Sequence, residues 1–289
     1  MAEPAGAGAA DEQDPAGPFE RDTAVALRER SDEAAVFDAE VADGWVAGRG
    51  PHGGYLAAML LRALIATVDD TQRAPRSLTI HYARAPEPGP VTIRTAIERA
   101  GRSLSTLSGR MEQGGRLMAL VLAAFSVPWE APSIDDLPMP DVEGPDVERR
   151  AGTARQFGAP PFTEHLVMQP RFQGRPLTGE RRPMELGAWI GLAEERPVDA
   201  LSVAFFDALI PTPFMATGAP AAAPTIDLTV HFRQSLPRPQ ERGLGQLCYA
   251  QMSSRLLSEG FFEEDGVIWA ADGTVLAQSR QLALLMPVG

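Results

Sequence analysis

Leu78-Thr79-Ile80-His81-Tyr82 returns 150 positions later as a near copy, Leu228-Thr229-Val230-His231-Phe232. Each copy follows an apolar segment typical of a helix and precedes three segments typical of strands. A chain built from two copies of one unit predicts two similar halves, with a functional site at the seam between them. The second half carries Asp207, Thr225 and Gln281, to which the first half has nothing comparable. This difference indicates that the chemistry belongs to the second half.

The two halves show the same order of expected elements. In the first half, residues 55–68 are apolar on every side, which indicates a buried helix. Four expected strands follow it at residues 77–84, 91–99, 103–112 and 116–127, separated by proline- and glycine-rich turns. In the second half the expected helix is 196–209, and the expected strands are 164–172, 184–192, 225–233, 245–253, 259–270 and 274–286. A buried helix beside a meander of strands favours an antiparallel sheet wrapped round that helix.

These patterns predict a division of the chain into four parts. Residues 1–33, rich in alanine, glycine, proline and acids, are expected to form a flexible N-terminal tail. Residues 34–130 form the first half, which opens with a pair of short strands within 37–46. Residues 131–160 form a linker rich in proline and aspartate. Residues 161–289 form the second half, which carries the catalytic residues.

Composition excludes several classes of function. The net charge is −12, which argues against nucleic acid as a partner, because phosphate binding requires a basic surface. All 26 basic residues are arginines, so a Schiff-base lysine and the lysine of a phosphate-binding P-loop are both excluded. The single cysteine excludes an internal disulfide. No signal peptide and no apolar run long enough to span a membrane is found, so we expect a soluble cytoplasmic protein.

Several catalytic motifs are missing from the sequence. It contains no G-x-S-x-G, no H-E-x-x-H, no cysteine pair and no dinucleotide-binding glycine fingerprint. We therefore expect neither a nucleophile-elbow hydrolase nor a bound metal or cofactor.

Five short motifs, taken in order, resemble those of the type II acyl-CoA thioesterases, a superfamily of tandem hotdog domains. They are Gly53-Gly54, the strand and turn from Ile80 to Gly89, Arg99–Ser103, Thr225–Phe232, and Asp272-Gly273 with Gln281. The resemblance spans residues 37–286. It implies an α+β double hotdog, in which two tandem antiparallel sheets are each wrapped round a central helix. It further implies hydrolysis of an acyl-CoA substrate to free acid and CoA by a homodimer or higher homo-oligomer.

Asp207 is the first candidate for a catalytic base. It interrupts the apolar segment 204–210, and a carboxylate in such surroundings is paired, capped or functional. An aspartate at the helix end, satisfied by backbone donors, explains the residue equally well. The resemblance favours the functional role, because the position matches the catalytic aspartate of the family.

Thr225 and Gln281 are the candidates for holding the attacking water. In the related thioesterases an aspartate, a threonine or serine, and a glutamine hold this water together, and the resemblance carries those roles to Asp207, Thr225 and Gln281. Either residue alone also fits an ordinary strand position. Strand alternation places Thr225 on the face opposite Leu228, unless a β-bulge turns it round. Asp227, in phase with Thr225, is the rival carboxylate.

The start of the first expected helix is the candidate oxyanion site. Gly53 and Gly54 allow close approach, and a helix N-terminus presents free N–H groups. We expect the Gly54 N–H group to face the Asp207 site, although a turn that needs glycine only for its geometry also explains the pair. His52 would contact substrate or cap the turn. The repeated His81 and His231 indicate packing or a contact across the seam.

Two residue types have peripheral expected roles. Cys248 is expected to be a buried, inert thiol. Arg102 and Arg233 are proposed to meet the CoA phosphates at the rim of the site.

Two other functions fit the same motifs. The first is a hotdog enoyl-CoA hydratase or dehydratase, in which His52 would have to act with a carboxylate. The second is a non-catalytic protein that binds acyl thioesters.

Overall fold

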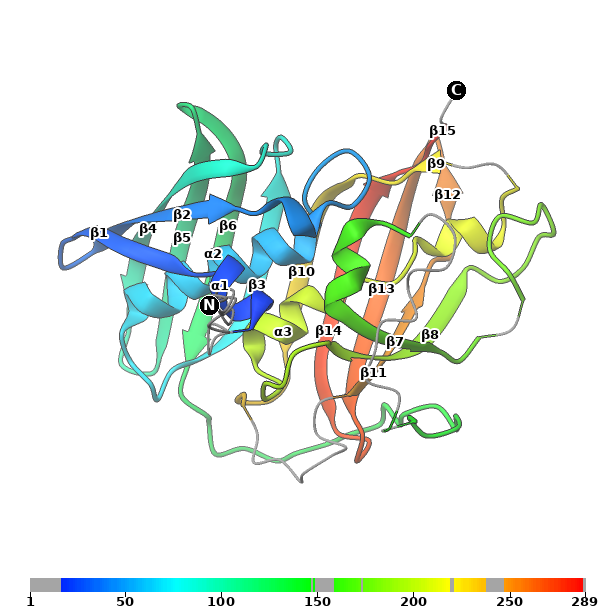
Figure 1. The fold of residues 1–289 in the computed structure, drawn as a ribbon. Helices are drawn as coiled ribbons and strands as arrows, with labels where there is room; N and C mark the ends of the chain where they lie inside the picture. The colour runs from blue at the N-terminus through cyan, green and yellow to red at the C-terminus, as the bar shows by residue number, and fades with distance from the viewer. Residues whose placement is uncertain are drawn as a thin grey trace, which may run out of the picture.

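The two copies of the repeated sequence form neighbouring strands at the centre of one antiparallel sheet. They are β3 (Ala74–Tyr82) and β10 (Thr225–Phe232), in which Thr79 lies opposite Thr229. The two threonine hydroxyls are 3.1 Å apart and hydrogen-bonded. Their neighbours in the repeat, such as Leu78 opposite Val230, are buried on the other face. The repeat therefore forms the seam between the halves, where β3 and β10 lie side by side at the middle of the molecule (Figure 1).

This computed structural model describes residues 17–146, 148, 159–172, 174–218, 221–237 and 247–287. The main sheet has 13 strands in the order β1-β2-β4-β5-β6-β3-β10-β14-β13-β11-β8-β7, with β12 paired to β13. Every pairing is antiparallel, as the turn-rich sequence predicted. We expected two tandem sheets. The described strands instead form one continuous sheet, because β3 and β10 satisfy each other's edge hydrogen bonds.

The strands on the two sides of the seam have the following bounds. On the side of the first half they are β1 (Val25–Arg30), β2 (Ala34–Val41), β4 (Gly89–Ala100), β5 (Leu104–Gln113) and β6 (Arg116–Ser126). On the side of the second half they are β7 (Leu166–Pro170), β8 (Glu185–Leu192), β11 (Cys248–Ser253), β12 (Leu257–Ser258), β13 (Phe261–Ala270) and β14 (Val275–Leu284). The short strands β9 (Ala221–Ala222) and β15 (Met286–Pro287) pair separately. Three 3₁₀ turns are η1 (Asp43–Trp45), η3 (Pro161–His165) and η4 (Thr212–Met215).

Two α-helices lie against the concave face of the sheet. The helix α2 (Gly53–Val68) is buried along most of its length, as its apolar sequence predicted, and contacts β3, β4, β5 and β6. The helix α3 (Ala200–Phe205) also has only buried residues, and it packs against α2 (Figure 1). It is shorter than the expected helix 196–209, because an Asp199–Ser202 capping box fixes its start and the chain leaves the helix at Phe206.

Residues 17–30 correct the expectation of a flexible tail over 1–33. They form the helix α1 (Pro18–Asp22) and the strand β1. Phe19 is 1% exposed and packs against Phe205, with ring centroids 5.5 Å apart. Glu20 accepts hydrogen bonds from Arg62 of α2 at 2.7 Å and from Arg196 before α3 at 2.8 Å. Burial of the aromatic ring and this paired charge explain why a segment of polar composition is ordered. Residues 1–16 lie outside the described part. The pair of strands expected within 37–46 is also wrong, since only β2 and η1 form there.

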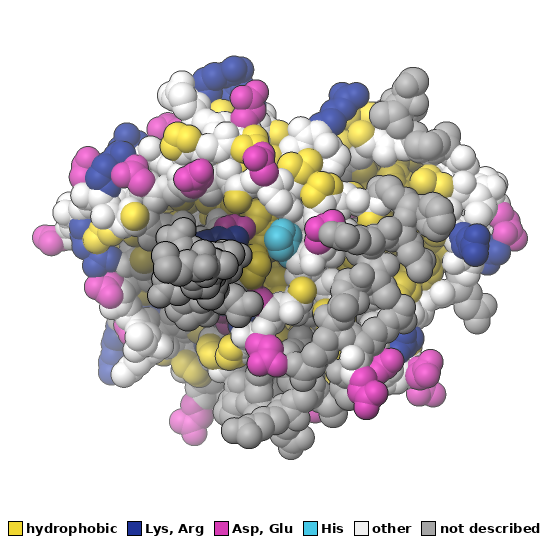
Figure 2. Space-filling view, in the orientation of Figure 1, with side chains coloured by type: hydrophobic (Ala, Val, Ile, Leu, Met, Phe, Trp, Pro, Cys, Tyr) yellow, Lys and Arg dark blue, Asp and Glu magenta, His cyan; other side chains and the backbone are white. Residues whose placement is uncertain are grey.

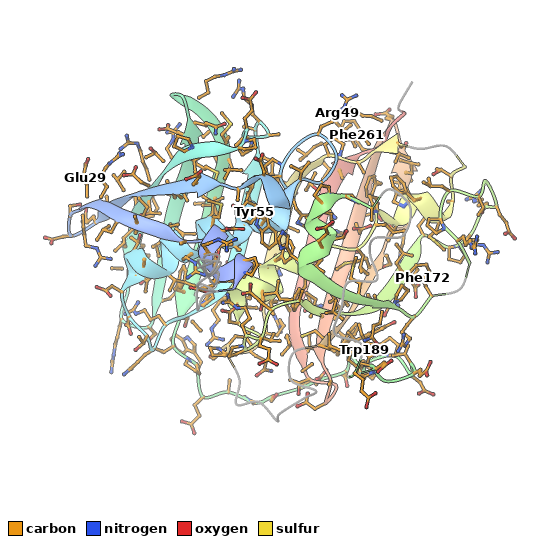
Figure 3. The ribbon with its side chains drawn as sticks, viewed as in Figure 1. Glu29, Arg49, Tyr55, Phe172, Trp189 and Phe261 are labelled. Atoms are coloured by element: carbon orange, nitrogen blue, oxygen red, sulfur yellow. The ribbon has the colours of Figure 1, made fainter. Side chains whose placement is uncertain are left out.

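Part of the expected linker packs on the outer face of the sheet. The Trp269 indole donates to the Leu137 carbonyl at 3.2 Å, and the Trp189 indole donates to the Glu143 carbonyl at 2.9 Å. Met139 and Val142 contact the cluster that contains both tryptophans. Figure 3 shows Trp189 low on the side of the second half, and Tyr55 at the middle of the molecule. Residues 147 and 149–158 of the linker lie outside the described part.

The surface shows charges of both signs. On the face drawn in Figure 2, acidic and basic side chains are interspersed round the periphery, and apolar side chains gather towards the middle. Among the described residues, no helix has the length and apolar character needed to cross a membrane.

Candidate active site

Thr225 and Gln281 are joined directly by their side chains. The Thr225 hydroxyl donates to the Gln281 Oε1 atom at 2.7 Å. The two residues come from the neighbouring strands β10 and β14. The structure thus brings together two of the three residues expected to hold water.

A β-bulge at the start of β10 explains how Thr225 reaches the inner face. Thr225 pairs with Ala283, whereas Asp227 pairs with Leu282, so Ile226 is the extra residue. The bulge turns Thr225 towards the face that carries buried Leu228 and Ala283. It leaves Asp227 on the opposite face with Thr229, which removes Asp227 as the rival carboxylate.

Gln281 is held from its other side by Glu264, a residue that the sequence analysis missed. The Gln281 Nε2 atom donates to the Glu264 Oε1 atom at 2.8 Å. Glu264 lies directly opposite Gln281 in the pairing of β13 with β14, and it is only 3% exposed. No clear signal in the sequence identifies it, because Phe261 and Phe262 are adjacent and only the structure shows that Phe262 is the buried one.

The second oxygen of Glu264 is also occupied. The Thr212 backbone N–H group donates to Glu264 Oε2 at 2.8 Å. The Thr212 hydroxyl in turn bonds the Ser254 hydroxyl at 2.5 Å. Thr212 and Ser254 are buried, so the network Thr225–Gln281–Glu264–Thr212–Ser254 runs from the seam into the second half.

Asp207 lies just after α3, in the turn that follows the helix, and not within a helix as we expected. It makes no hydrogen bond to any residue in the described part of the chain. Burial, and to a smaller extent the negative charge of Glu264, raises the pKa of its carboxyl group to about 8. Burial also raises the pKa of Glu264, while hydrogen bonds from Thr212 and Gln281 oppose that rise. The two carboxyl groups are therefore electrostatically coupled inside the protein.

Tyr82 and Gly53 are residues of the first half that belong to the region of Asp207. The Tyr82 hydroxyl, on β3, donates to the Gly53 carbonyl oxygen at 2.9 Å. Burial raises the pKa of Tyr82, and the charge of Asp207 raises it as well. Tyr82 thus lies within electrostatic reach of Asp207 while holding the first turn of α2.

Gly54 allows α2 to touch the segment that carries Asp207. A Cβ atom at Gly54 would lie 2.9 Å from the Phe205 Cα atom and 3.0 Å from the Phe205 carbonyl oxygen. Only glycine permits this approach, because backbone atoms cannot move aside as a side chain can. The predicted proximity of the start of α2 to the end of α3 is therefore found.

His52 caps α2, which corrects the expected role of the Gly54 N–H group. That N–H group donates to the His52 Nδ1 atom at 3.1 Å and is thus already engaged. Burial lowers the pKa of His52 to about 4, so the imidazole is neutral at pH 7. Its ring stacks on Phe162 with centroids 4.3 Å apart. The Gly53 N–H group has no hydrogen-bond partner among the described residues.

The remaining predicted residues lie apart from this network. His81 and His231 are exposed on the outer face, where their backbone partners across the seam are Asp227 and Ser77. Of the two roles expected for these histidines, the prediction that they pack in the interior is therefore wrong. Cys248 is buried as predicted, and burial raises its pKa to about 12.

Arg102 and Arg233 do not border the Thr225–Gln281 pair. Arg233 follows Phe232, at the opposite end of β10 from Thr225, about 26 Å away at strand spacing. Arg102 lies in the β4–β5 turn, near the same distant end of the sheet. That these two arginines meet the CoA phosphates stays a prediction.

The geometry can support attack by water on a bound carbonyl group. The Thr225 hydroxyl, whose proton is already engaged by Gln281, lies on a seam strand, and the start of α2 packs on the segment that leads to Asp207. Among the described residues, no group of three or more His, Cys, Asp or Glu side chains could hold a metal ion.

Comparisons with known proteins find similar sequences and similar folds. The sequence model of the acyl-CoA thioesterase N-terminal domain matches residues 41–126, and that of the C-terminal domain matches residues 135–285. An uncharacterised protein of Mycobacterium tuberculosis is 24% identical over 299 residues, covering 91% of this chain and 97% of its own.

Two solved structures share the fold. A hotdog-fold protein of unknown function from Alicyclobacillus acidocaldarius has a TM-score of 0.82 and 23% identity, with 95% of this chain and 100% of that chain covered. An acyl-CoA thioesterase II of Mycobacterium marinum has a TM-score of 0.70 and 17% identity, with 94% and 98% covered.

Proposed function

We propose that this chain, which belongs to the acyl-CoA thioesterase family, hydrolyses a fatty acyl-CoA or a related acyl thioester to the free acid and the thiol. The observation that carries the proposal is the hydrogen bond between Thr225 and Gln281, next to the Asp207–Glu264 pair. The fold is taken as a double hotdog, in which each half contributes one helix to the seam. The start of the second half at residue 161 remains part of this proposal, whereas the first half begins before residue 34, because β1 belongs to its sheet.

The reaction proceeds by direct attack of water. The Thr225 hydroxyl donates a hydrogen bond to Gln281, so its oxygen is free to accept a hydrogen bond from the bound water. The ionised Asp207 carboxylate takes the other proton as the water oxygen bonds to the thioester carbonyl carbon. The tetrahedral oxyanion then collapses, the carbon–sulfur bond breaks, and the proton on Asp207 passes to the leaving thiolate. Free acid and thiol are the products, with no covalent enzyme intermediate.

The N-terminus of α2 stabilises the oxyanion in this scheme. The Gly53 N–H group is available, and the positive end of the helix dipole adds to its effect. A single donor of this kind contributes ~2.7–4 kcal/mol to transition-state stabilisation. His52 acts indirectly, since it fixes the turn through the Gly54 N–H group.

The hydratase alternative is less well supported. It needs His52 to exchange a proton with substrate, but the His52 Nδ1 atom already accepts from Gly54 and the pKa of the ring is about 4. A non-catalytic binding protein would not need a carboxyl group as costly to bury as Asp207.

A panel of acyl-CoA substrates, with colorimetric detection of free thiol, tests the proposal. The wild type should release thiol, and Asp207→Asn should lose about 10²–10⁴-fold in kcat/KM, the usual contribution of a positioned base. Asp227→Asn is the matched control, because this carboxylate lies on the opposite face of β10, and it should keep wild-type activity. Wild-type turnover by Asp207→Asn would reject the assignment. Water addition to an enoyl-CoA without thiol release would favour the hydratase.

A further inference from the structure

We propose that Glu264 is a positioning residue that orients the attacking water through Gln281 and Thr225. This inference deepens the proposed function and rests on it. Glu264 is suited to the role because it is almost fully buried and contacts both Gln281 and the backbone of η4.

The Glu264 carboxylate sets the direction of the hydrogen bonds that run from it through Gln281 to Thr225. An ionised carboxylate only accepts, so the Gln281 amide must turn its Nε2 atom to Glu264 and its Oε1 atom to Thr225. The Thr225 hydroxyl must then donate to Gln281, which leaves only lone pairs for the water. The water consequently directs one proton to Thr225 and the other to Asp207, and its own lone pair remains free for the carbonyl carbon.

The reversed amide would have the opposite effect. If Nε2 faced Thr225, the hydroxyl would accept from the amide and point its own proton at the water. That proton would occupy one of the two lone pairs of the water, and Thr225 would no longer hold a water proton in place. Glu264 therefore selects the productive one of two orientations that have nearly the same shape.

The same carboxylate controls where the proton resides. Glu264 accepts two hydrogen bonds that favour its charged form, whereas Asp207 accepts none from the described residues. The charges of buried Glu264 and half-buried Asp207 disfavour each other, so the pair holds a proton up to higher pH than either group alone. When the two carboxyl groups of Asp207 and Glu264 together hold one proton, that proton accordingly lies on Asp207.

The groups that face this pair come from every neighbouring element. Thr212 belongs to η4, Gln281 to β14, and Tyr82 to β3. Tyr82 is the other titratable group that senses Asp207. Glu263 and Asp265 lie on the outer face of β13, where Glu263 accepts from the Arg255 N–H group and Asp265 pairs with Arg280.

The decisive variant is Glu264→Gln, which keeps the shape and removes the charge. The acid limb of its kcat/KM profile against pH should move to lower pH by about one unit or more, because Asp207 loses a like charge. Its kcat at the plateau should fall up to ~10²-fold, the effect of a small misplacement of a reacting group, with KM little changed. Asp265→Asn, an exposed neighbour on the other face, is the control and should change neither quantity. A merely structural Glu264 would lower stability without moving the pH limb.

A second readout does not depend on turnover. The infrared band of the protonated carboxyl group, assigned by its loss in Asp207→Asn, should titrate at lower pH in Glu264→Gln than in the wild type. If Glu264→Gln does not fold, the same titration is done on Asp207→Asn. The midpoint that remains there, which belongs to Glu264, should lie at lower pH than the higher of the two wild-type midpoints. If neither the infrared midpoint nor the acid limb of the kcat/KM profile shifts in Glu264→Gln, this inference is overturned and the proposed function is not. A wild type that hydrolyses no acyl thioester overturns the proposed function instead.

Discussion

Asp207 is a residue whose ionisation costs the folded protein free energy. Its pKa is raised to about 8 in the folded state, against about 3.9 for an exposed aspartate. The folded state therefore binds a proton that the unfolded state releases between these pH values. Because the unfolded state holds fewer protons there, stability falls as the pH rises through this window.

Asp207→Asn should consequently stabilise the protein more at high pH than at low pH. The amide stays neutral, so it avoids the cost of a buried charge while filling the same space. We expect its Tm to be closest to that of the wild type near pH 4 and to exceed it by about 2 °C or more near pH 9. Differential scanning calorimetry across this range measures the effect. An equal Tm difference at all pH values would contradict the raised pKa.

The sequence analysis named three of the proposed catalytic residues and missed Glu264. Asp207, Thr225 and Gln281 were named because they match motifs of a known family. Glu264 was missed because it is one of three consecutive acids, and only the pairing of β13 with β14 shows which one faces inwards. The orientation of Thr225 needed the bulge at Ile226, which strand alternation alone does not reveal.

At the scale of elements, the contact between α2 and α3 joins the two halves of the site. Gly54 packs directly on the backbone of Phe205, two residues before Asp207. The helix α2 was predicted well, since its apolar sequence and glycine start are local signals. The helix α3 was predicted too long, because its end depends on the packing of Phe206 and the turn that follows rather than on local preference.

Gly54→Ala should destabilise the protein by about 1–3 kcal/mol, the usual cost of forcing an extra methyl group into a packed interior. The added Cβ atom would meet backbone atoms of Phe205 at 2.9–3.0 Å, so one helix must shift. Urea denaturation gives the free energy of unfolding. Gly53→Ala is the matched comparison, since its Cβ atom would meet only the Tyr82 side chain, at 3.2 Å, and should cost less. A larger loss of unfolding free energy in Gly53→Ala than in Gly54→Ala would contradict the importance of the close contact between α2 and Phe205.

At the scale of the whole molecule, the repeated sequence accounts for the architecture. Its two copies pair with each other about the Thr79–Thr229 hydrogen bond, and this pairing makes one sheet from two halves. The duplication, the antiparallel pairing and most strand positions could be predicted from sequence because they follow from local patterns. The joining of the sheets and the ordering of residues 17–30 could not, because both depend on contacts between distant parts of the chain.

Assembly beyond one chain stays a prediction. Leu120 and Leu122 of β6 are 44% and 56% exposed on the outer face of the sheet. The family resemblance favours a homodimer or higher homo-oligomer, and the described surface is compatible with it.

A single turnover of acyl-CoA in ¹⁸O-labelled water tests most directly whether the seam hydrolyses a thioester with one activated water. Mass spectrometry of the released acid and of the peptide containing Asp207 follows the oxygen. Direct attack should place one labelled oxygen in the acid and none in Asp207. Labelled oxygen in the Asp207 carboxyl group, or no acid release at all, would contradict the account.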